Sequence, residues 1–285
     1  MSEPSQQRIE IPGHTIAAQV WGDPTARPTV LALHGWLDSS ASFARLAPLV
    51  RRARIIAVDL PGHGASSHKP AGSSYHFVDA VSDTVAIIDA LGLERPLLLG
   101  HSMGAGISSL VAGLLPSRIR GVFLIEGLGP LTDDPKNAAT RLADSLKQQD
   151  KHRRDRRRVF ATLEDAASRL ELAQKISSEA AAILAALATE AVAGGLRWRA
   201  DPRLRIASRM RFTEAQVHAF LSAIKAPVRL IQAERGFPFD PPTMEARVAM
   251  VPDLTLVNVP GHHHVHLDSP GHVAPSLQEL IDTSS

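Results

Sequence analysis

A serine lies between two glycines at the end of an apolar run, in the segment LLGHSMG at residues 98–104. The apolar residues before Ser102 predict a strand, and the residues after it predict a helix. A sharp strand-to-helix turn of this composition presents the serine hydroxyl at the carboxyl edge of a sheet, as in a Gly-x-Ser-x-Gly nucleophile elbow. The N-terminus of the following helix favours developing negative charge. We therefore interpret Ser102 as a nucleophile.

A second turn, His34-Gly35-Trp36, follows the apolar run TVLAL. Such a turn can direct the backbone N–H of Trp36 into the same cleft as the backbone N–H of Met103. Two N–H donors directed at one oxygen stabilise the tetrahedral intermediate of acyl transfer. We predict that Trp36 and Met103 form an oxyanion hole.

Four histidines, His262, His263, His264 and His266, crowd one segment near the C-terminus and are candidates for the general base. A metal site is the alternative interpretation of such a cluster. Neighbouring histidines on one loop point in different directions, however, and no carboxylate cluster of suitable spacing accompanies them. We predict neither a metal nor a cofactor.

A carboxylate must orient the base, and Glu126 ends the apolar run GVFLIEG. A carboxylate at the end of a buried strand is costly unless it is paired, and a histidine across the cleft would supply a partner. The alternative is a solvated strand end with a salt bridge to an arginine. Two later acidic residues, Glu234 and Asp240, are further candidates.

The elements that position these residues alternate along the chain. Short apolar runs at 29–35, 54–62, 96–102 and 121–127 are separated by helix-length amphipathic stretches. This order predicts an α/β fold with a mostly parallel, doubly wound sheet that is buried on both faces.

The alternation stops at Gly129-Pro130 and resumes after Pro227. The residues between are rich in alanine and helix-forming patterns, and no strand-like run interrupts them. We therefore predict a core domain made of residues 1–129 and 223–285, with residues 130–222 inserted as a helical cap.

Composition narrows the function classes. The net charge of +2 suggests neither a nucleic-acid partner nor a membrane partner, and the absence of cysteine excludes disulfides and thiolate catalysis. The polar start and the lack of a long apolar run indicate a cytoplasmic protein. The basic run KHRRDRRR at residues 151–158 is interpreted as a solvated helix face. The sequence leaves the oligomeric state open.

Several motifs together resemble the α/β-hydrolase superfamily: LALHGWLDSSASF, VDLPGHGAS, LLGHSMGAGIS and VPGHHHVHLDSP. The pair HGW and DLPGHG is similar to the serine hydrolase-like subgroup, which is close to capped esterases and haloalkane dehalogenases. The resemblance implies an α/β-hydrolase fold with a cap after strand 6, and the chain order nucleophile, acid, histidine. It also implies that the catalytic histidine precedes the proline of the final helix by seven residues. Counting from Pro270 gives His263, with His264 and His266 in reserve.

The resemblance also identifies a departure at the acid. In most of the family an aspartate follows the seventh strand, but here the turn reads Ala233-Glu234-Arg235-Gly236, with glycine at that position. One branch of the dehalogenases instead takes the acid from the end of the sixth strand, which corresponds to Glu126. The predicted triad is Ser102, His263 and Glu126, with Glu234 as the second candidate acid.

A serine at the nucleophile position predicts an acyl-enzyme rather than an alkyl-enzyme. We expect hydrolysis of a carboxylic ester or thioester of a small, apolar substrate, as in a carboxylesterase. The alternatives are a carbon–carbon bond hydrolase, a lactonase, a cofactor-free lyase or oxygenase, and a non-catalytic binding protein that docks a partner through residues 151–158.

Overall fold

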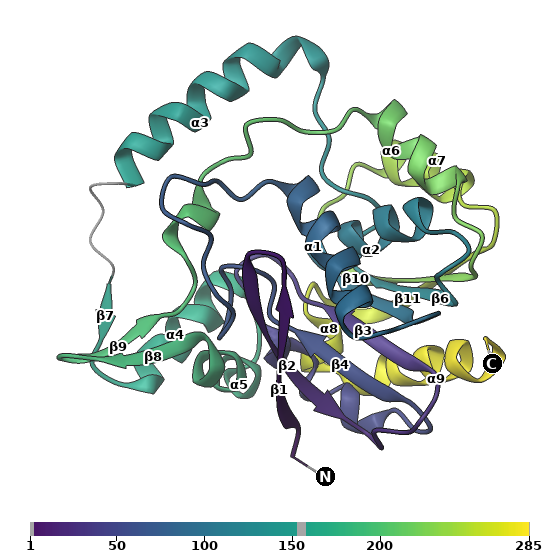
Figure 1. Ribbon diagram of the computed structural model, residues 1–285, viewed down its shortest axis with the longest axis horizontal. Helices are drawn as coiled ribbons and strands as arrows, with labels where there is room; N and C mark the ends of the chain where they lie inside the picture. The colour runs from purple at the N-terminus through teal and green to yellow at the C-terminus, as the bar shows by residue number, and fades with distance from the viewer. Residues whose placement is uncertain (1–2, 153–157, 285) are drawn as a thin grey trace.

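An eight-stranded sheet forms the centre of the computed structural model, which describes residues 3–152 and 158–284 (Figure 1). The strand order is β1-β2-β4-β3-β5-β6-β10-β11. Strands β1 and β2 form an antiparallel hairpin, β2 pairs antiparallel with β4, and the remaining pairs are parallel. The strands are β1 Ser5–Ile11, β2 His14–Trp21, β3 Thr29–Leu33, β4 Arg54–Val58, β5 Leu97–His101, β6 Gly121–Ile125, β10 Val228–Arg235 and β11 Leu254–His262. The predicted α/β-hydrolase fold with a mostly parallel sheet is confirmed.

Both faces of the sheet are buried, because alternate residues of each strand point to opposite sides. In β6, Val122 and Leu124 pack into one hydrophobic cluster, whereas Phe123 and Ile125 pack into the other. The first cluster is covered by α1 Phe77–Ala90, α2 Met103–Leu114, α6 Glu214–Ser222 and α7 Pro241–Met250. The second is covered by the short helix η1 Ser40–Phe43, by α8 Val265–Asp268 and by α9 Ala274–Thr283. This double cover explains why the strands are continuous apolar runs.

The chain between β6 and β10 contains the predicted insertion. Its helices are η3 Pro135–Asn137, α3 Ala138–His152, α4 Leu163–Gln174, α5 Ser178–Ala188, η4 Pro202–Arg205 and α6. Figure 1 shows α3 at the periphery of the molecule, well away from the sheet. Hydrogen bonds from Ser145 to the Ala207 carbonyl and from the Ala207 N–H to Gln148 connect α3 to the segment that follows η4.

The expectation that no strand interrupts the insertion is wrong. Three short strands form a second sheet of order β7-β9-β8: β7 Val159–Phe160, β8 Thr189–Val192 and β9 Gly195–Trp198. The segment ATEAVAGG seemed helical because it is rich in alanine, yet α5 ends at Ala188. Gly194 and Gly195 have φ of +86° and +141°, which a helix does not accommodate, and Val192 pairs with Gly195 across the turn.

Helix α6 falls within the predicted cap boundaries, but it packs on α2. A Cβ built at Gly113 of α2 would lie 2.2 Å from the carbonyl oxygen of Phe220 in α6. Only a glycine permits so close an approach of two helix backbones.

Two further sequence predictions concern the basic run at residues 151–158 and the lack of a membrane-spanning segment. Residues 153–157, most of the basic run, lie outside the described residues. Among the described residues, no helix has the length and hydropathy that crossing a membrane requires.

Candidate active site

Ser102 occupies a strained turn between β5 and α2. Its φ of 53° and ψ of −112° lie outside the regions that residues with a side chain prefer. A Cβ at Gly104 would lie 2.0 Å from the Leu33 carbonyl oxygen, and one at Gly100 would lie 2.4 Å from the Gly104 carbonyl oxygen. The two glycines of the motif are therefore required by backbone contacts, and the turn between them presents the Ser102 side chain at the carboxyl edge of the sheet.

His263 follows the last strand of the sheet and contacts both other residues of the predicted triad. Its Nε2 lies 3.0 Å from the Ser102 Oγ, and its Nδ1 lies 3.1 Å from Oε2 of Glu126. Strands β5, β6 and β11 end at the same edge, so residues far apart in the sequence meet there (Figure 1). The structure thus brings Ser102, His263 and Glu126 together in one hydrogen-bonded line.

Glu126 comes directly after β6 and is 1% exposed. Two backbone N–H groups donate to its carboxylate: Ala233 to Oε1 and Phe237 to Oε2, each at 2.6 Å. Its backbone is also unusual, with φ of 57°. These two N–H donors and the His263 imidazole offset the cost of burying a carboxylate.

Gly236, which stands where most of the family would have the acid, lies against the Glu126 carboxylate. A Cβ built at Gly236 would be 2.0 Å from Oε2 of Glu126. The missing side chain therefore leaves the space that the carboxylate from β6 occupies.

The other candidate acids point elsewhere. Glu234 is exposed at the end of β10, and Asp240 is exposed and accepts a hydrogen bond from the Thr243 N–H at the start of α7. Among the contacts of the described residues, neither of them reaches His263.

The predicted oxyanion turn lies directly over the serine. A Cβ at Gly35 would be 3.4 Å from the Ser102 Cβ, and Met103 is the first residue of α2. Within residues 3–152 and 158–284, the backbone N–H groups of Trp36 and Met103 donate to no protein acceptor. Both positions are therefore compatible with the predicted oxyanion hole.

Trp36 makes a contact that the sequence did not reveal. Its indole Nε1–H donates to the Leu204 carbonyl oxygen at 2.9 Å, although the side chain is 51% exposed. Leu204 belongs to η4 of the insertion, so this bond joins the oxyanion turn to the inserted segment. No sequence signal marks such a bond, because it depends on how the insertion folds back.

Three further histidines, His101, His264 and His266, form a buried layer next to the base. His101 Nε2 donates to the His263 carbonyl oxygen at 2.9 Å, and His266 Nε2 lies 2.8 Å from the Ser42 Oγ. Burial lowers the pKa of His266 to about 3 and that of His101 well below the usual value, so both rings are neutral. The reserve candidates His264 and His266 contact Asp38 and Ser42, respectively, while His262 is exposed.

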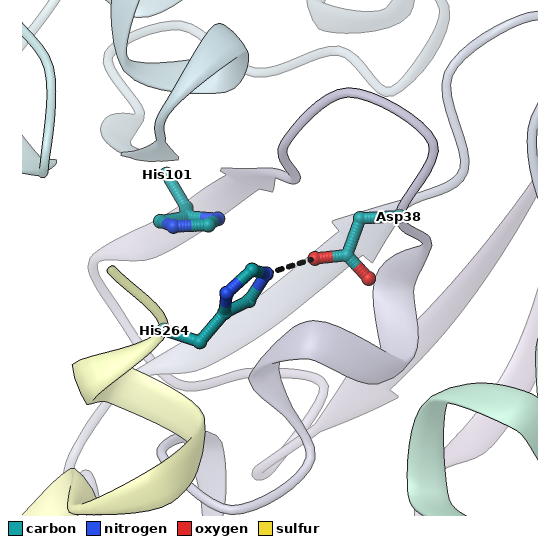
Figure 2. Close-up of side chains that lie close together, drawn as sticks. All are labelled: Asp38, His101 and His264. Carbon is teal, nitrogen blue, oxygen red and sulfur yellow. Dashed lines mark ion pairs between the residues drawn. The ribbon is translucent and has the colours of Figure 1, made fainter. Parts of the chain in front are cut away.

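Two histidines of this layer, together with the neighbouring Asp38, are candidate metal ligands. Asp38, His101 and His264 are buried, and each offers a ligand atom within 4.8 Å of the others. Figure 2 shows the His264 ring directed at the Asp38 carboxylate, 3.7 Å away, with the His101 ring to one side. Zinc ligands lie about 2.0–2.2 Å from the metal and hence roughly 3.3–3.5 Å from one another. These side chains would have to move closer together to hold zinc, and the absence of a metal stays a prediction.

A cavity of about 110 Å³ lies beside the oxyanion turn, between the core and the insertion. Its walls combine apolar side chains with a few polar ones, as is common in small-molecule sites. The lining residues are Trp36, Leu60, Pro61, His63, Lys69, Tyr75, His76, Phe77, Ala80, Asp83, Met103, Leu204, Ile206 and Ser208. The inserted segment therefore contributes part of the wall of a cavity that Met103, the residue after Ser102, also lines.

Comparison with known proteins identifies the family of this fold. Residues 28–270 match the family described as alpha/beta hydrolase fold. The serine hydrolase-like protein of Danio rerio is 33% identical over 99% of this chain and 89% of its own. A hypothetical protein of Pseudomonas aeruginosa PAO1 has a crystal structure that superposes with a TM-score of 0.90, at 41% identity over 99% of each chain. A thioesterase domain from the curacin biosynthetic pathway superposes with a TM-score of 0.83, at 29% identity over 98% of this chain and 99% of that one.

Proposed function

Because this chain belongs to the α/β-hydrolase fold family and is a hydrolase, we propose that it cleaves a carboxylic ester or thioester through an acyl-enzyme on Ser102. The observation that carries the proposal is the line of hydrogen bonds from Ser102 through His263 to Glu126. A nucleophile, a base and an orienting acid in this arrangement are the equipment of acyl transfer.

The chemistry follows from the direction of each hydrogen bond. Glu126 accepts the Nδ1–H of His263, which leaves the Nε2 lone pair facing the Ser102 hydroxyl. As Oγ bonds to the acyl carbon, Nε2 takes the serine proton, and the carbonyl π electrons move to the oxygen. The N–H groups of Trp36 and Met103 face that oxyanion.

The intermediate then collapses. The carbonyl re-forms, the bond to the leaving oxygen or sulfur breaks, and the His263 imidazolium protonates the leaving group. A water molecule then repeats the sequence on the acyl-enzyme, with His263 again as the base, and releases a carboxylic acid and free Ser102.

Thioesters are included because of a specific likeness. The thioesterase domain from the curacin pathway is similar to this chain over nearly its whole length. A thiolate is a better leaving group than an alkoxide, so the same residues serve both reactions. Comparing an acyl N-acetylcysteamine thioester with the matching ethyl ester measures which leaving group is preferred.

The proposal is tested with p-nitrophenyl butyrate and a fluorophosphonate probe on the full chain. We expect turnover by the wild type and labelling of Ser102, and a fall in kcat of at least about 10³-fold in Ser102→Ala. Ser222→Ala, an exposed position at the end of α6, is the matched control and keeps both turnover and labelling. No turnover above the buffer rate together with an unlabelled Ser102 would refute the proposal.

A further inference from the structure

One wall of the cavity beside Ser102 is helix α1, and this wall carries a carboxylate without a partner. Phe77, Ala80 and Asp83 line the cavity at helical spacing, so they share one face of α1. Asp83 is partly buried, and no hydrogen bond or ion pair to it is found among the described residues. Most partly buried carboxylates of this chain have such a partner, as Asp133 does with Arg141.

Two cationic side chains near this wall, Lys69 and Arg203, are each paired with another carboxylate. Lys69, which also lines the cavity, lies 2.7 Å from Asp79. Arg203 binds the Asp201 carboxylate and three backbone carbonyl oxygens. The Lys69–Asp79 pair is neutral overall, and Asp83 therefore leaves an excess of one negative charge at this wall.

A carboxylate in a cavity loses hydration, and among the described residues no hydrogen bond or ion pair to Asp83 replaces it. Burial raises the pKa of Asp83, whereas Lys69 and His14 act in the opposite direction. A ligand group that carries a positive charge and an N–H would restore the lost interactions, since charge-assisted hydrogen bonds are the stronger kind.

The position of Asp83 on α1 determines where a positively charged ligand group would bind relative to the helix that follows Ser102. Phe77 lies close to Gly106, one turn into the helix that follows Ser102, since a Cβ at Gly106 would be 3.2 Å from the Phe77 Cζ. Asp83 lies six residues further along α1, which corresponds to about 9 Å of helix. The same wall thus combines a carboxylate with an apolar stretch formed by Phe77 and Ala80, in a cavity that Met103, the residue after Ser102, also lines.

We infer that Asp83 binds a cationic ammonium group of the substrate, so that the preferred ester or thioester carries an amine separated from the reacting carbonyl by an apolar linker. This inference rests on the proposed function. It assigns the α1 wall of the same cavity a role in selecting the substrate by its charge.

The test compares p-nitrophenyl esters whose acyl chains end in dimethylammonium or in isopropyl, which have the same shape and differ in charge. A series of linker lengths is used, with a carboxylate-ended set alongside. We expect the wild type to favour the cationic end at one linker length. In Asp83→Asn the ratio of kcat/KM between the cationic and isopropyl esters falls by at least about tenfold, because a charge-assisted hydrogen bond is lost.

Asp89→Asn is the matched control. It removes a carboxylate from the same helix at an exposed position that faces Arg118 instead of the cavity, and it leaves the ratio unchanged. A ratio that is the same in wild type and Asp83→Asn at every length overturns the inference while leaving the proposed hydrolysis intact. A preference for the carboxylate end also overturns it and assigns the recognition to Lys69.

A binding measurement separates this inference from the chemistry. N,N-dimethylpentylamine and a neutral alcohol of the same size are titrated calorimetrically into Ser102→Ala and into Ser102→Ala/Asp83→Asn. We expect the amine to bind more tightly than the alcohol in the first protein alone. Equal binding of amine and alcohol in Ser102→Ala would contradict the inference even if no ester were ever turned over.

Discussion

The ends of two neighbouring strands, β6 and β10, make different use of the same edge of the sheet. The strands pair in parallel from Val122 with Val228 to Ile125 with Ile231. Beyond this pairing, β6 continues into the buried Glu126, whereas β10 continues into exposed residues and Gly236. The end of β6 supplies the carboxylate, and two N–H groups hold it: that of Ala233 within β10 and that of Phe237 just after β10. The hydrogen-bond donors and the free space at this edge therefore both favour a carboxylate carried by β6.

The largest effect expected at this edge comes from Glu126→Gln. An amide has one acceptor oxygen in place of two, so it cannot accept from Ala233, Phe237 and His263 together. We expect kcat for p-nitrophenyl butyrate to fall by about 10²- to 10⁴-fold, in keeping with the loss of an orienting carboxylate. Glu234→Gln, at the end of β10, is the matched control and changes kcat by less than about twofold, as is usual for an exposed side chain away from the site. The reverse order of the two variants would assign the acid to β10.

An exchange of side chains between the two strand ends gives an effect of intermediate size. Gly236→Asp alone places a Cβ against the Glu126 carboxylate and should lower kcat, because the site is already filled. Combined with Glu126→Ala, the new aspartate has the vacated space, and we expect kcat at least about tenfold above that of Glu126→Ala, since it restores a charged partner for His263.

The φ of Gly236 lies outside the left-handed region, so the backbone accepts an aspartate. Melting temperatures of the single and double variants show whether the packing conflict is relieved. A double variant no more active than Glu126→Ala would mean that the end of β10 cannot hold the acid even when space is available.

The smallest effect on turnover is expected from the buried histidine layer, which affects stability instead. Burial, with a contribution from His264, holds the pKa of His266 at about 3, against 6.5 in the unfolded chain, while Asp38 acts in the opposite direction. Below pH 6.5 the His266 imidazole binds a proton in the unfolded chain but stays neutral in the folded protein, so the free energy of unfolding decreases as the pH falls.

For one such histidine the loss is about 2 kcal/mol between pH 7 and pH 5. We therefore expect the free energy of unfolding, measured with urea, to depend less on pH in His266→Gln than in the wild type by about this amount. Exposed His262→Gln is the control and leaves the pH dependence as in the wild type. Equal slopes for wild type and His266→Gln would show that this ring does not titrate differently in the two states.

The sequence predicted the α/β core because the strands are continuous apolar runs, and it predicted Ser102 and Glu126 because each ends such a run. The choice of His263 came from its spacing to Pro270, which the family resemblance implies. The apolar run that ends in Glu126, together with the resemblance to a family in which position 236, here a glycine, would carry the acid, favoured β6, and Glu234 stayed the second candidate. The roles of Ser102, His263 and Glu126 in catalysis remain predictions until the variants are measured.

Other features could not be predicted because they depend on packing over long distances. Alanine-rich composition concealed the turn at Gly194 and the sheet that it forms. The close contact of Gly236 with the Glu126 carboxylate, and the position of Asp83 on the cavity wall, follow from how the elements fold against one another. Local sequence pattern contains no information about such contacts.

The hydrogen bond from the Trp36 indole to the Leu204 carbonyl links the turn after β3 to η4 of the inserted segment. At 2.9 Å it is near the ideal length, and a shift of η4 by about 1 Å would break it. The turn that carries the Trp36 N–H is therefore braced by the inserted segment and not only by the sheet. Because coupling between sites is reciprocal, the proposed oxyanion hole predicts that a ligand which holds η4 in place would also hold the turn at Trp36, and that an oxyanion bound at Trp36 would hold η4.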